Sequence, residues 1–407
     1  MHARAISCPA LKSRAGAPVP YRDPVRIRAV LLVGAVLSGV AAPRGGPLLL
    51  SDNVAGAVTA GAVFRFADPR IDEASGLAVG IRSPGVLYVQ NDSGDSARFF
   101  AVDAATGRTL AVCRVPGAQN LDWEDLATAR DAGGVPSVWL GDIGDNDEVR
   151  TSITVYRVDE PAVANGSDGG ASRELDTARP DVWRLRYPDG PHNAEALFID
   201  PRSHRGYVVT KSLFGQSEVF ELPASPSATT VQVLSRVGSI DFGFTGTPGG
   251  PNLVGQLTAT GAAMSADGDR LVVRTYTDAY LWTVSGSAVA GALRGKPIRT
   301  PLPAQPLGEG VAFGGRGLLI DTEGAGTAVQ TLALPANPRS ADEASTVVPS
   351  ASTSPAGNAQ QTGSRTAAAD PTSGPGGGSG VGWPLAGCGL VVAALAGRRF
   401  RRSRGRH

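Results

Sequence analysis

One phrase recurs five times along the middle of this chain. In each copy a short apolar run leads through a polar turn into a second apolar run, which ends on a polar side chain. The copies begin at Glu73, Glu124, Glu195, Gly261 and Glu309. A period of roughly 50 to 70 residues made of short strands is typical of a propeller built blade by blade. The repeat therefore predicts an all-β fold.

The strand pattern predicts a β-propeller of five or six four-stranded blades within residues 61–336. Helical spacing of apolar side chains is nearly absent there, whereas turn residues separate short β-rich runs throughout. The fifth repeat supplies only three strands, and residues 62–66 are expected to complete it. This pairing would close the ring and remove an open sheet edge.

Two long connections interrupt the pattern. A loop at 162–180 precedes the last strand of the second blade, and the third blade is expected to end in a strand at 230–237. A segment rich in Gly and Pro follows at 241–257. A sixth blade within residues 239–260 is the alternative to a simple excursion, so both blade counts stay open.

The first residues are typical of an export signal. Residues 1–28 carry six basic side chains against the single Asp23, and residues 29–42 are almost wholly apolar and small. This order predicts a signal peptide within residues 1–44, cut after the Val-Ala-Ala at 40–42. The alternative is a buried strand or helix at the start of the domain.

The last residues predict a stalk and a membrane anchor. Residues 337–380 are rich in Ser, Thr, Ala, Pro and Gly, which favours a flexible, disordered stalk. Residues 381–397 are uncharged and apolar, and the six Arg residues of 398–407 follow them. The order fits a transmembrane helix with a basic cytoplasmic tail. A tail that does not span, or that a sorting enzyme removes, is the alternative, and no Leu-Pro-x-Thr-Gly precedes the span.

Charge excludes one class of partner. Of 38 Lys and Arg residues, 13 lie in the two ends, whereas only one of 37 Asp and Glu residues does, so the remainder carries a net charge of −11. Such a domain is a poor match for nucleic acid and a better one for cations or a basic partner. Cys113 is the only cysteine between the ends, so no disulfide within the domain is expected.

Polar residues at equivalent repeat positions define the candidate site. The first strand of each blade lines the central channel, so residues at its start, and those ending the second strand, are expected near one channel mouth. The candidate ligand-binding residues are Glu73, Asp92, Glu124, Asp142, His192, Glu195, Lys211, Arg274, Glu309 and Asp321. Converging carboxylates repel one another and raise one another's pKa values unless a cation lies among them.

Calcium is the expected cofactor, because oxygen ligands of this kind suit calcium or magnesium. The expected metal ligands are Glu124, Asp142, Asp145 and Glu195. The segment 141–148 is the most ligand-like loop, although its spacing is not that of an EF-hand. Two other interpretations stay open: the Glu residues bind backbone amides of neighbouring blades, or they take part in catalysis.

Signals for other chemistry are sparse. No Gly-x-Ser-x-Gly elbow occurs, and no zinc ligand set is evident. His192 is a candidate base or ligand at the channel mouth, or simply a solvated loop residue. Lys211 is a candidate contact for a phosphate or carboxylate, or the partner of Glu195. The catalytic residues of an enzyme are not identified by the sequence.

A resemblance emerges from several motifs taken together. They are Glu-Ala-Ser-Gly-Leu-Ala from Glu73, Asn-Asp-Ser-Gly-Asp from Asn91, Asp-Trp-Glu-Asp-Leu from Asp122, Gly-Asp-Ile-Gly-Asp-Asn from Gly141, Asn-Ala-Glu-Ala-Leu from Asn193 and Arg-Thr-Tyr from Arg274. As a set they resemble a family of exported actinobacterial β-propeller proteins. Membership would imply the propeller and not an activity.

The opening at Glu73 is more distantly similar to that of phytase-like propellers. In those proteins acidic side chains hold calcium ions that clamp phosphate. The resemblance therefore implies a metal-assisted phosphoester or ester hydrolase as an alternative function. The chain departs from that pattern because only Lys211 and Arg274 supply positive charge at channel positions.

Together these features predict a membrane-tethered extracellular propeller that binds a small molecule or a protein partner at the channel mouth, with calcium. We expect an exported, monomeric protein anchored in the plasma membrane through its C-terminal helix, without a nucleic-acid partner. A purely structural surface protein is a third reading.

Overall fold

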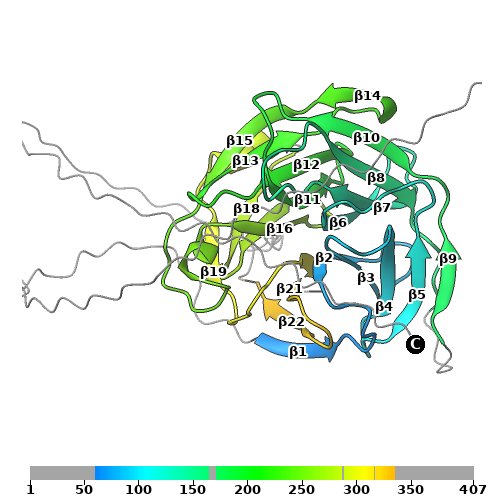
Figure 1. The fold of residues 1–407 in the computed structure, drawn as a ribbon. Coiled ribbons are helices and arrows are strands. Elements are labelled where there is room, and N and C mark those ends of the chain that lie inside the picture. The colour runs from blue at the N-terminus through cyan, green and yellow to red at the C-terminus, as the bar shows by residue number, and fades with distance from the viewer. Residues whose placement is uncertain (1–59, 165–170, 287, 316, 335–407) are drawn as a thin grey trace, which may run out of the picture. The chain divides into compact units, whose positions relative to one another are not determined.

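The computed structural model describes residues 60–164, 171–286, 288–315 and 317–334, which form five mainly antiparallel sheets set around an axis (Figure 1). The innermost strands of these sheets are β2 (Ala74–Val79), β6 (Trp123–Arg130), β11 (Ala194–Asp200), β16 (Ala259–Met264) and β20 (Val311–Gly314). Each innermost strand contacts the next, and β20 contacts β2. The ring is therefore closed with five blades.

The other strands follow outward in each blade. Blade 1 continues with β3 (Val86–Asn91), β4 (Arg98–Asp103) and β5 (Thr109–Arg114); blade 2 with β7 (Pro136–Asp142), β8 (Ile153–Asp159) and β10 (Asp181–Arg186); blade 3 with β12 (Arg205–Thr210), β13 (Gln216–Glu221) and β15 (Ser235–Asp241); blade 4 with β17 (Arg270–Thr275), β18 (Asp278–Thr283) and β19 (Ile298–Pro301); blade 5 with β21 (Gly317–Ile320), β22 (Ala328–Ala333) and β1 (Ala60–Arg65).

The sixth blade that was considered as an alternative within residues 239–260 does not form. The first residues of this segment, up to Asp241, are the end of β15, and its last residues begin β16. Between the two strands lies the short 3-10 helix η1 (Leu253–Gln256). The Gly- and Pro-rich stretch is instead held over blade 4, because Thr245 and Thr247 each donate a hydrogen bond of 2.8 Å to the buried carboxylate of Asp278. Of the two blade counts, five is confirmed.

The predicted closure of the ring is confirmed. Strand β1 pairs antiparallel with β22, so the start of the domain completes the blade formed by its end. Phe64 and Phe66 pack with Ile71, Leu77 and other buried residues between blades 5 and 1. The closing strand thus covers the edge of β22, joins the two ends of the domain and contributes to the apolar core.

Two outer strands differ from the prediction. The expected strand at 230–237 is two strands: β14 (Ser227–Val233) runs parallel to β10 of blade 2, and β15 pairs with β13 of blade 3. The expected loop at 162–180 contains β9 (Arg173–Asp176), which runs parallel to β5 of blade 1. Each extra strand covers the edge of the preceding blade and is mostly exposed. Such polar, exposed strands lack the alternation that sequence reading depends on.

Apolar side chains fill the space between neighbouring blades. Strand β11 is buried along its whole length, as expected for a strand that lines the channel and packs on both faces. Tilted Trp139 and Trp183 rings, with centroids 4.8 Å apart, belong to the core between blades 2 and 3. Cys113 is buried and free. Within the described residues the blades are therefore held together by packing and not by a disulfide.

The predicted signal peptide (1–44), stalk (337–380), transmembrane helix (381–397) and basic tail (398–407) lie outside the described residues. Within the described part of the chain, where the helices are η1 and α1 (Val289–Leu293), no helix is long and apolar enough to cross a membrane.

Strand β1 offers a test of the closure. Phe64 is 7% exposed and Val63 is 42% exposed. Replacing Phe64 by Ala should lower the free energy of unfolding by about 3–5 kcal/mol, because it removes a buried aromatic side chain between the joined blades. Val63→Ala should change it by less than about 0.5 kcal/mol. Chemical denaturation followed by fluorescence measures both, and equal effects would contradict the closure.

Candidate functional site

The inner strands all begin at the same end of the ring, and this brings acidic side chains from several blades together. We call the group Asp92, Asp122, Glu124, Glu195, Glu309 and Glu323 the acidic mouth. Glu124 and Glu195 are the second residues of β6 and β11, and Glu309 precedes β20. Glu195 interacts electrostatically with the other five carboxylates. The predicted gathering at one mouth is therefore present.

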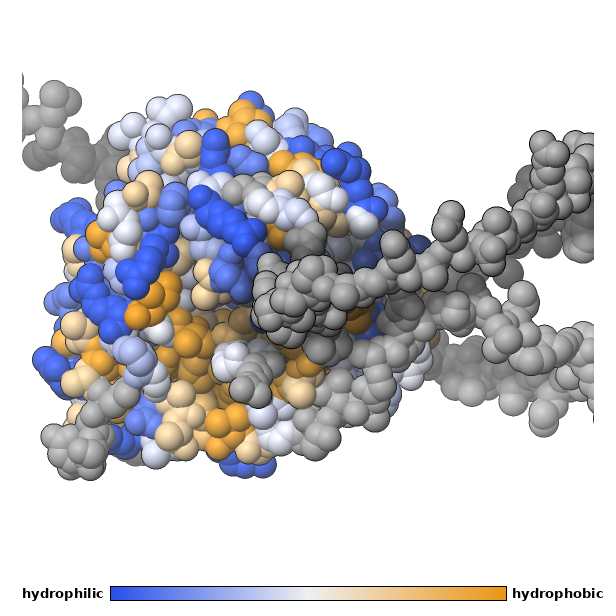
Figure 2. Space-filling model, turned by 180° about the vertical axis from the view of Figure 1, so that it is seen from behind, coloured by the Kyte–Doolittle hydropathy of each residue, from blue (hydrophilic) through white to orange (hydrophobic). Residues whose placement is uncertain are grey.

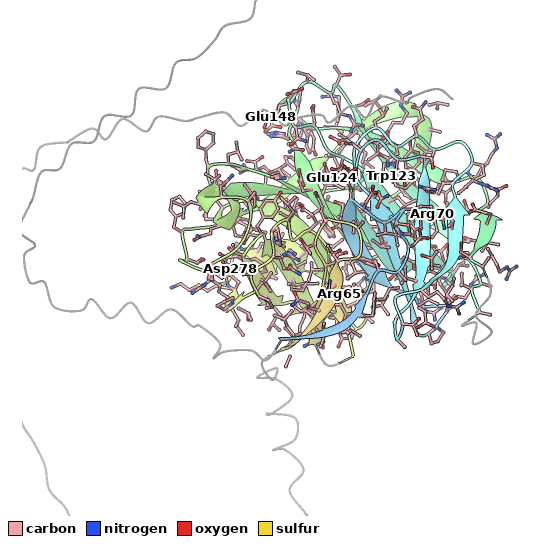
Figure 3. All side chains as sticks on the ribbon, turned by 60° about the horizontal axis from the view of Figure 1, so that its bottom comes forward. Arg65, Arg70, Trp123, Glu124, Glu148 and Asp278 are labelled. Carbon is pink, nitrogen blue, oxygen red and sulfur yellow. The ribbon has the colours of Figure 1, made fainter. Side chains whose placement is uncertain are left out.

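The tightest part of the acidic mouth is formed by Asp92, Asp122 and Glu124. One oxygen from each of these carboxylates lies within 4.8 Å of the others. Gly144 leaves the room for them, since a Cβ there would collide with Glu124 Oε1 and Asp122 Oδ2. Among the described residues, no donor makes a hydrogen bond to the carboxylate of Glu124, whereas the side chain of Asp92 shares one with Asp122. Figure 3 shows Glu124 in the interior and Glu148 near the edge of the molecule.

Burial and mutual repulsion raise the pKa values of this group. Burial, with Glu195 as the next cause, raises the pKa of Asp92 to about 8. The same two causes raise the pKa of Glu124 well above its usual value, and burial raises that of Glu323 to about 7. These carboxylates are therefore under-compensated by positive charge.

Lys211 is the cation that lies nearest to Glu195. Its Nζ is 2.8 Å from Glu195 Oε1 and donates a hydrogen bond of 3.2 Å to the hydroxyl of Tyr276. Burial acts to lower the pKa of Lys211, but Glu195 and the other neighbours outweigh it and the pKa is raised. Asn193 Nδ2 donates to the same Glu195 oxygen at 3.2 Å. Of the two roles predicted for Lys211, the pairing with Glu195 is present.

Arg274 is fully buried and binds backbone instead of carboxylate. Its guanidinium donates to the carbonyl oxygens of Gly310 at 3.0 Å and Asp321 at 3.3 Å, and to Gln305 Oε1 at 3.0 Å. It therefore ties blade 4 to blade 5. Burial lowers the pKa of Arg274 to about 10.

Glu309 and Asp321 keep unsatisfied oxygens. Asp321 Oδ1 accepts a hydrogen bond of 2.7 Å from the amide of Gly310. Asp321 Oδ2 and Glu309 Oε2 are buried without a hydrogen-bond partner in the described part of the chain. Burial raises the pKa of Asp321 to about 7 and that of Glu309 well above its usual value. Buried oxygens of this kind call for a proton or a cation.

Asp142 and Asp145 serve the loop between β7 and β8. Asp142 Oδ1 lies 3.0 Å from the guanidinium of Arg150 and accepts a hydrogen bond of 3.1 Å from the amide of Asp122. Asp145 accepts one of 2.7 Å from the amide of Arg150. These contacts shape the loop that carries Gly144. Glu73 lies at the surface. Partial burial of its carboxylate, together with the charges of Asp72 and Asp95, raises its pKa.

Asp125 is a channel residue that the sequence reading missed. Its Oδ2 accepts hydrogen bonds from the amides of Leu197 at 2.9 Å and Ala262 at 3.2 Å, and its Oδ1 from Leu126 at 2.8 Å. The blade-joining role that was considered for the repeat Glu residues is thus performed by the next residue along β6. Asp122, in the same Asp-Trp-Glu-Asp motif, was also not singled out as a candidate. The motif itself was the available signal.

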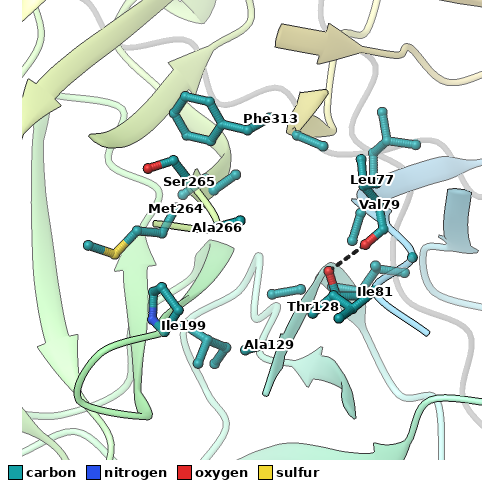
Figure 4. A pocket seen from close by; sticks show the side chains of 18 of the residues that line it. Leu77, Val79, Ile81, Thr128, Ala129, Ile199, Met264, Ser265, Ala266 and Phe313 are labelled. Atoms are coloured by element: carbon teal, nitrogen blue, oxygen red, sulfur yellow. Dashed lines mark hydrogen bonds between the residues drawn. The ribbon is translucent and has the colours of Figure 1, made fainter. Parts of the chain in front are cut away.

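The opposite end of the inner strands has a different character. A cavity of about 420 Å³ lies there, lined by Leu77, Leu126, Met264, Phe313 and other mainly apolar residues (Figure 4). On the face seen in Figure 2, apolar side chains gather toward the middle. Arg130 is the one ionisable residue that lines this cavity within the described chain. Of the two ends of the channel, the acidic mouth is therefore the one where the carboxylates gather.

Large apolar side chains are also exposed around the acidic mouth. At that end lie five such residues on loops and one on η1, and they are 58–80% exposed: Leu121, Val149, Leu213, Phe214, Phe244 and Leu253. We call them the apolar rim. They make up six of the eight large apolar residues that are exposed in the described chain. Exposed apolar residues gathered around a polar centre are typical of binding surfaces.

Comparison with known proteins adds little to this geometry. No protein-family model and no curated protein matches the chain. Among the solved structures, 490 chains match. One of them is a gluconolactonase of Xanthomonas campestris, which is 17% identical to this chain with a TM-score of 0.34. The match covers 64% of this chain and 72% of the other.

Two further matches are similar in extent. The hydrazine synthase of Kuenenia stuttgartiensis shows 12% identity and a TM-score of 0.30 over 61% of each chain. A chain of the nidogen/laminin complex shows 13% identity and a TM-score of 0.33 over 63% of this chain and 74% of the other. Likenesses of this size carry no argument about function. The resemblances to exported actinobacterial and phytase-like propellers stay predictions.

The raised pKa values predict how stability depends on pH. Unfolded Asp and Glu titrate near about 4, whereas Asp92 titrates at about 8 and Asp321 and Glu323 at about 7 in the folded state. The folded state binds more protons between these values, so the free energy of unfolding should fall as pH rises from about 4 to about 8. Thermal melts in a chelating buffer measure this.

A variant isolates the contribution of the mouth. Glu323→Gln removes one of the titrating groups, so the fall with pH should become shallower. Glu174→Gln, at an exposed position on β9, should leave it unchanged. Stability that is constant or rises over this pH range in the wild type would contradict the pKa assignments.

Proposed function

We propose that this protein is a membrane-tethered extracellular propeller that binds calcium at the acidic mouth and, with the ion, an oxygen-bearing ligand. The observation that carries the proposal is the cluster of Asp92, Asp122 and Glu124, whose oxygens lie within 4.8 Å of one another. Three buried carboxylates held this close are stabilised when a cation neutralises them. Carboxylate oxygens suit calcium, which accepts six to eight oxygen ligands.

Glu195 is the fourth ligand in this proposal. Its Oε1 is bound by Lys211 and Asn193, while its Oε2 receives no hydrogen bond from the described residues. Asp92 and Asp122 take the place of Asp142 and Asp145 in the set expected from sequence. The reason is that Arg150 neutralises Asp142 and that Asp145 accepts a backbone hydrogen bond from within its own loop.

The apolar rim indicates the kind of ligand. A molecule centred on the ion would meet Phe214 and Phe244, which are 80% and 63% exposed. The ligand therefore combines an oxygen-bearing group that completes the coordination of calcium with apolar parts that cover the rim. A small amphipathic molecule or a protein partner with an acidic side chain among apolar ones meets this description.

A metal-assisted ester or phosphoester hydrolase is the second candidate. The observation in its favour is Asp92: burial raises its pKa to about 8 in the ion-free site, so in this second function Asp92 stays protonated and Asp122, Glu124 and Glu195 alone hold the ion. A protonated carboxyl group there can supply a proton to a leaving group. Hydrolysis that disappears in both Glu124→Gln and Asp92→Asn, with the fold intact, would select this function over binding alone.

Calcium binding is tested directly by calorimetric titration of the purified protein. Glu124→Gln keeps the shape of the side chain but removes its charge, and it should weaken calcium binding by more than about tenfold, because even outer-shell partners of metal ligands contribute that much. Glu174→Gln is the matched control and should bind as the wild type does. The absence of calcium binding in the wild type would refute the proposal.

The proposed tether rests on the sequence of residues 381–397 and the Arg residues that follow. In cells that express the full chain, the protein should stay with the membrane pellet after an alkaline wash. Deletion of residues 381–397 should release it. If the deleted form still sediments with membranes, the C-terminal segment is not the anchor.

A further inference from the structure

A second cavity lies beside the acidic mouth. Lys211, which pairs with Glu195 of the acidic mouth, also lines this cavity. Its volume is about 500 Å³. The loop that carries Asn146, the segment before β11, the loop between β12 and β13, and β13 itself contribute its lining. Asn193 and Lys211, which both bind Glu195, form the wall that separates this cavity from the proposed calcium ligands.

Two possible metal ligands, His192 and Glu218, line this cavity, and a third, Asp189, lies against His192. Asp189, His192 and Glu218 each offer one ligand atom, and these atoms lie within 4.8 Å of one another. His192 Nε2 is 2.9 Å from Asp189 Oδ1. Two ligands at about 2.1 Å from one tetrahedral ion lie about 3.4 Å apart, so a small separation of this hydrogen-bonded pair would let both atoms bind one ion.

The His192 ring is held in place by aromatic neighbours. Its centroid is 4.9 Å from that of Tyr187, with the rings close to perpendicular, and 5.8 Å from that of Phe220. Tyr187 and Phe220 are buried. A ligand whose ring orientation is fixed before binding loses less entropy when the metal arrives.

Glu218 is oriented by a partner on the neighbouring strand. Its Oε1 lies 2.6 Å from the guanidinium of Arg236 in β15. Its Oε2 is buried and has no hydrogen-bond partner among the described residues. One oxygen is thus fixed by an outer partner and the other is left for a ligand, which is the arrangement that outer-shell partners give to metal-binding carboxylates.

We propose that Asp189, His192 and Glu218 bind a divalent transition-metal ion, with zinc as the chemical type. The set contains an imidazole nitrogen, which suits zinc and related ions and distinguishes it from the all-oxygen acidic mouth. Three protein ligands leave at least one coordination position for water or for a ligand in the cavity. This site is independent of the proposed calcium site. Glu218 and Asp189 carry no repeat signal, which is why the sequence indicated no such set.

The test uses tag-free protein, with Co²⁺ as a spectroscopic probe and Zn²⁺ as its competitor. Wild-type protein should bind Co²⁺ with visible ligand-field absorption, and one equivalent of Zn²⁺ should remove that absorption. His192→Asn and Glu218→Gln should each weaken binding by more than about tenfold. The matched controls are His204→Asn, in the turn between β11 and β12, and Glu221→Gln, in the same strand as Glu218; both should bind as the wild type does.

Two further measurements make every outcome decisive. Calcium titration and thermal melts of His192→Asn should match the wild type, which shows that the fold and the acidic mouth are intact. Glu124→Gln should lose calcium binding and keep Co²⁺ binding. Wild-type protein without ligand-field absorption, or variants of His192 and Glu218 that bind Co²⁺ as well as the controls do, would overturn the proposal.

Discussion

Repulsion between desolvated carboxylates at the axis of the ring is the constraint on which the rest of the account depends. The ring brings Asp92, Asp122, Glu124, Glu195 and Glu309 to one mouth, where Lys211 is the cation nearest to Glu195. Burial makes each charge more costly and weakens the screening between charges. The structure therefore requires either protons or a cation at this mouth. The raised pKa values describe the mouth when protons, and no cation, neutralise the carboxylates.

The fold separates two roles that a single sequence motif carries. In the Asp-Trp-Glu-Asp segment, Trp123 packs into the core, Glu124 faces the acidic mouth and Asp125 joins the inner strands through backbone amides. Asp125 holds the ring together where the neighbouring carboxylates repel one another. Three backbone hydrogen bonds offset the cost of burying the carboxylate of Asp125, whereas the carboxylate of Glu124 receives none from the described residues.

How far sequence could predict this structure depends on which interactions carry the signal. The propeller, the closing strand at 62–66 and the gathering of Glu124, Glu195 and Glu309 follow from a repeat of buried strands, and buried strands leave a strong pattern. The edge strands β9 and β14 leave no such pattern, because they are exposed and pair with a blade formed by an earlier part of the chain. Blade number was ambiguous for a related reason: the hydrogen bonds to Asp278 that fix the long excursion are contacts between distant residues.

Site residues outside the repeat were equally hidden. Asp122 and Glu218 occupy no repeated position, and Asp142, which does, is neutralised by Arg150, a partner that no spacing rule identifies. The measurement that tests the central claim most directly is a crystal structure of the protein grown with calcium. We predict one ion within about 2.3–2.6 Å of oxygens from Asp92, Asp122 and Glu124. An acidic mouth in which these carboxylates remain within hydrogen-bonding distance of one another, with calcium absent or bound elsewhere, would contradict the account.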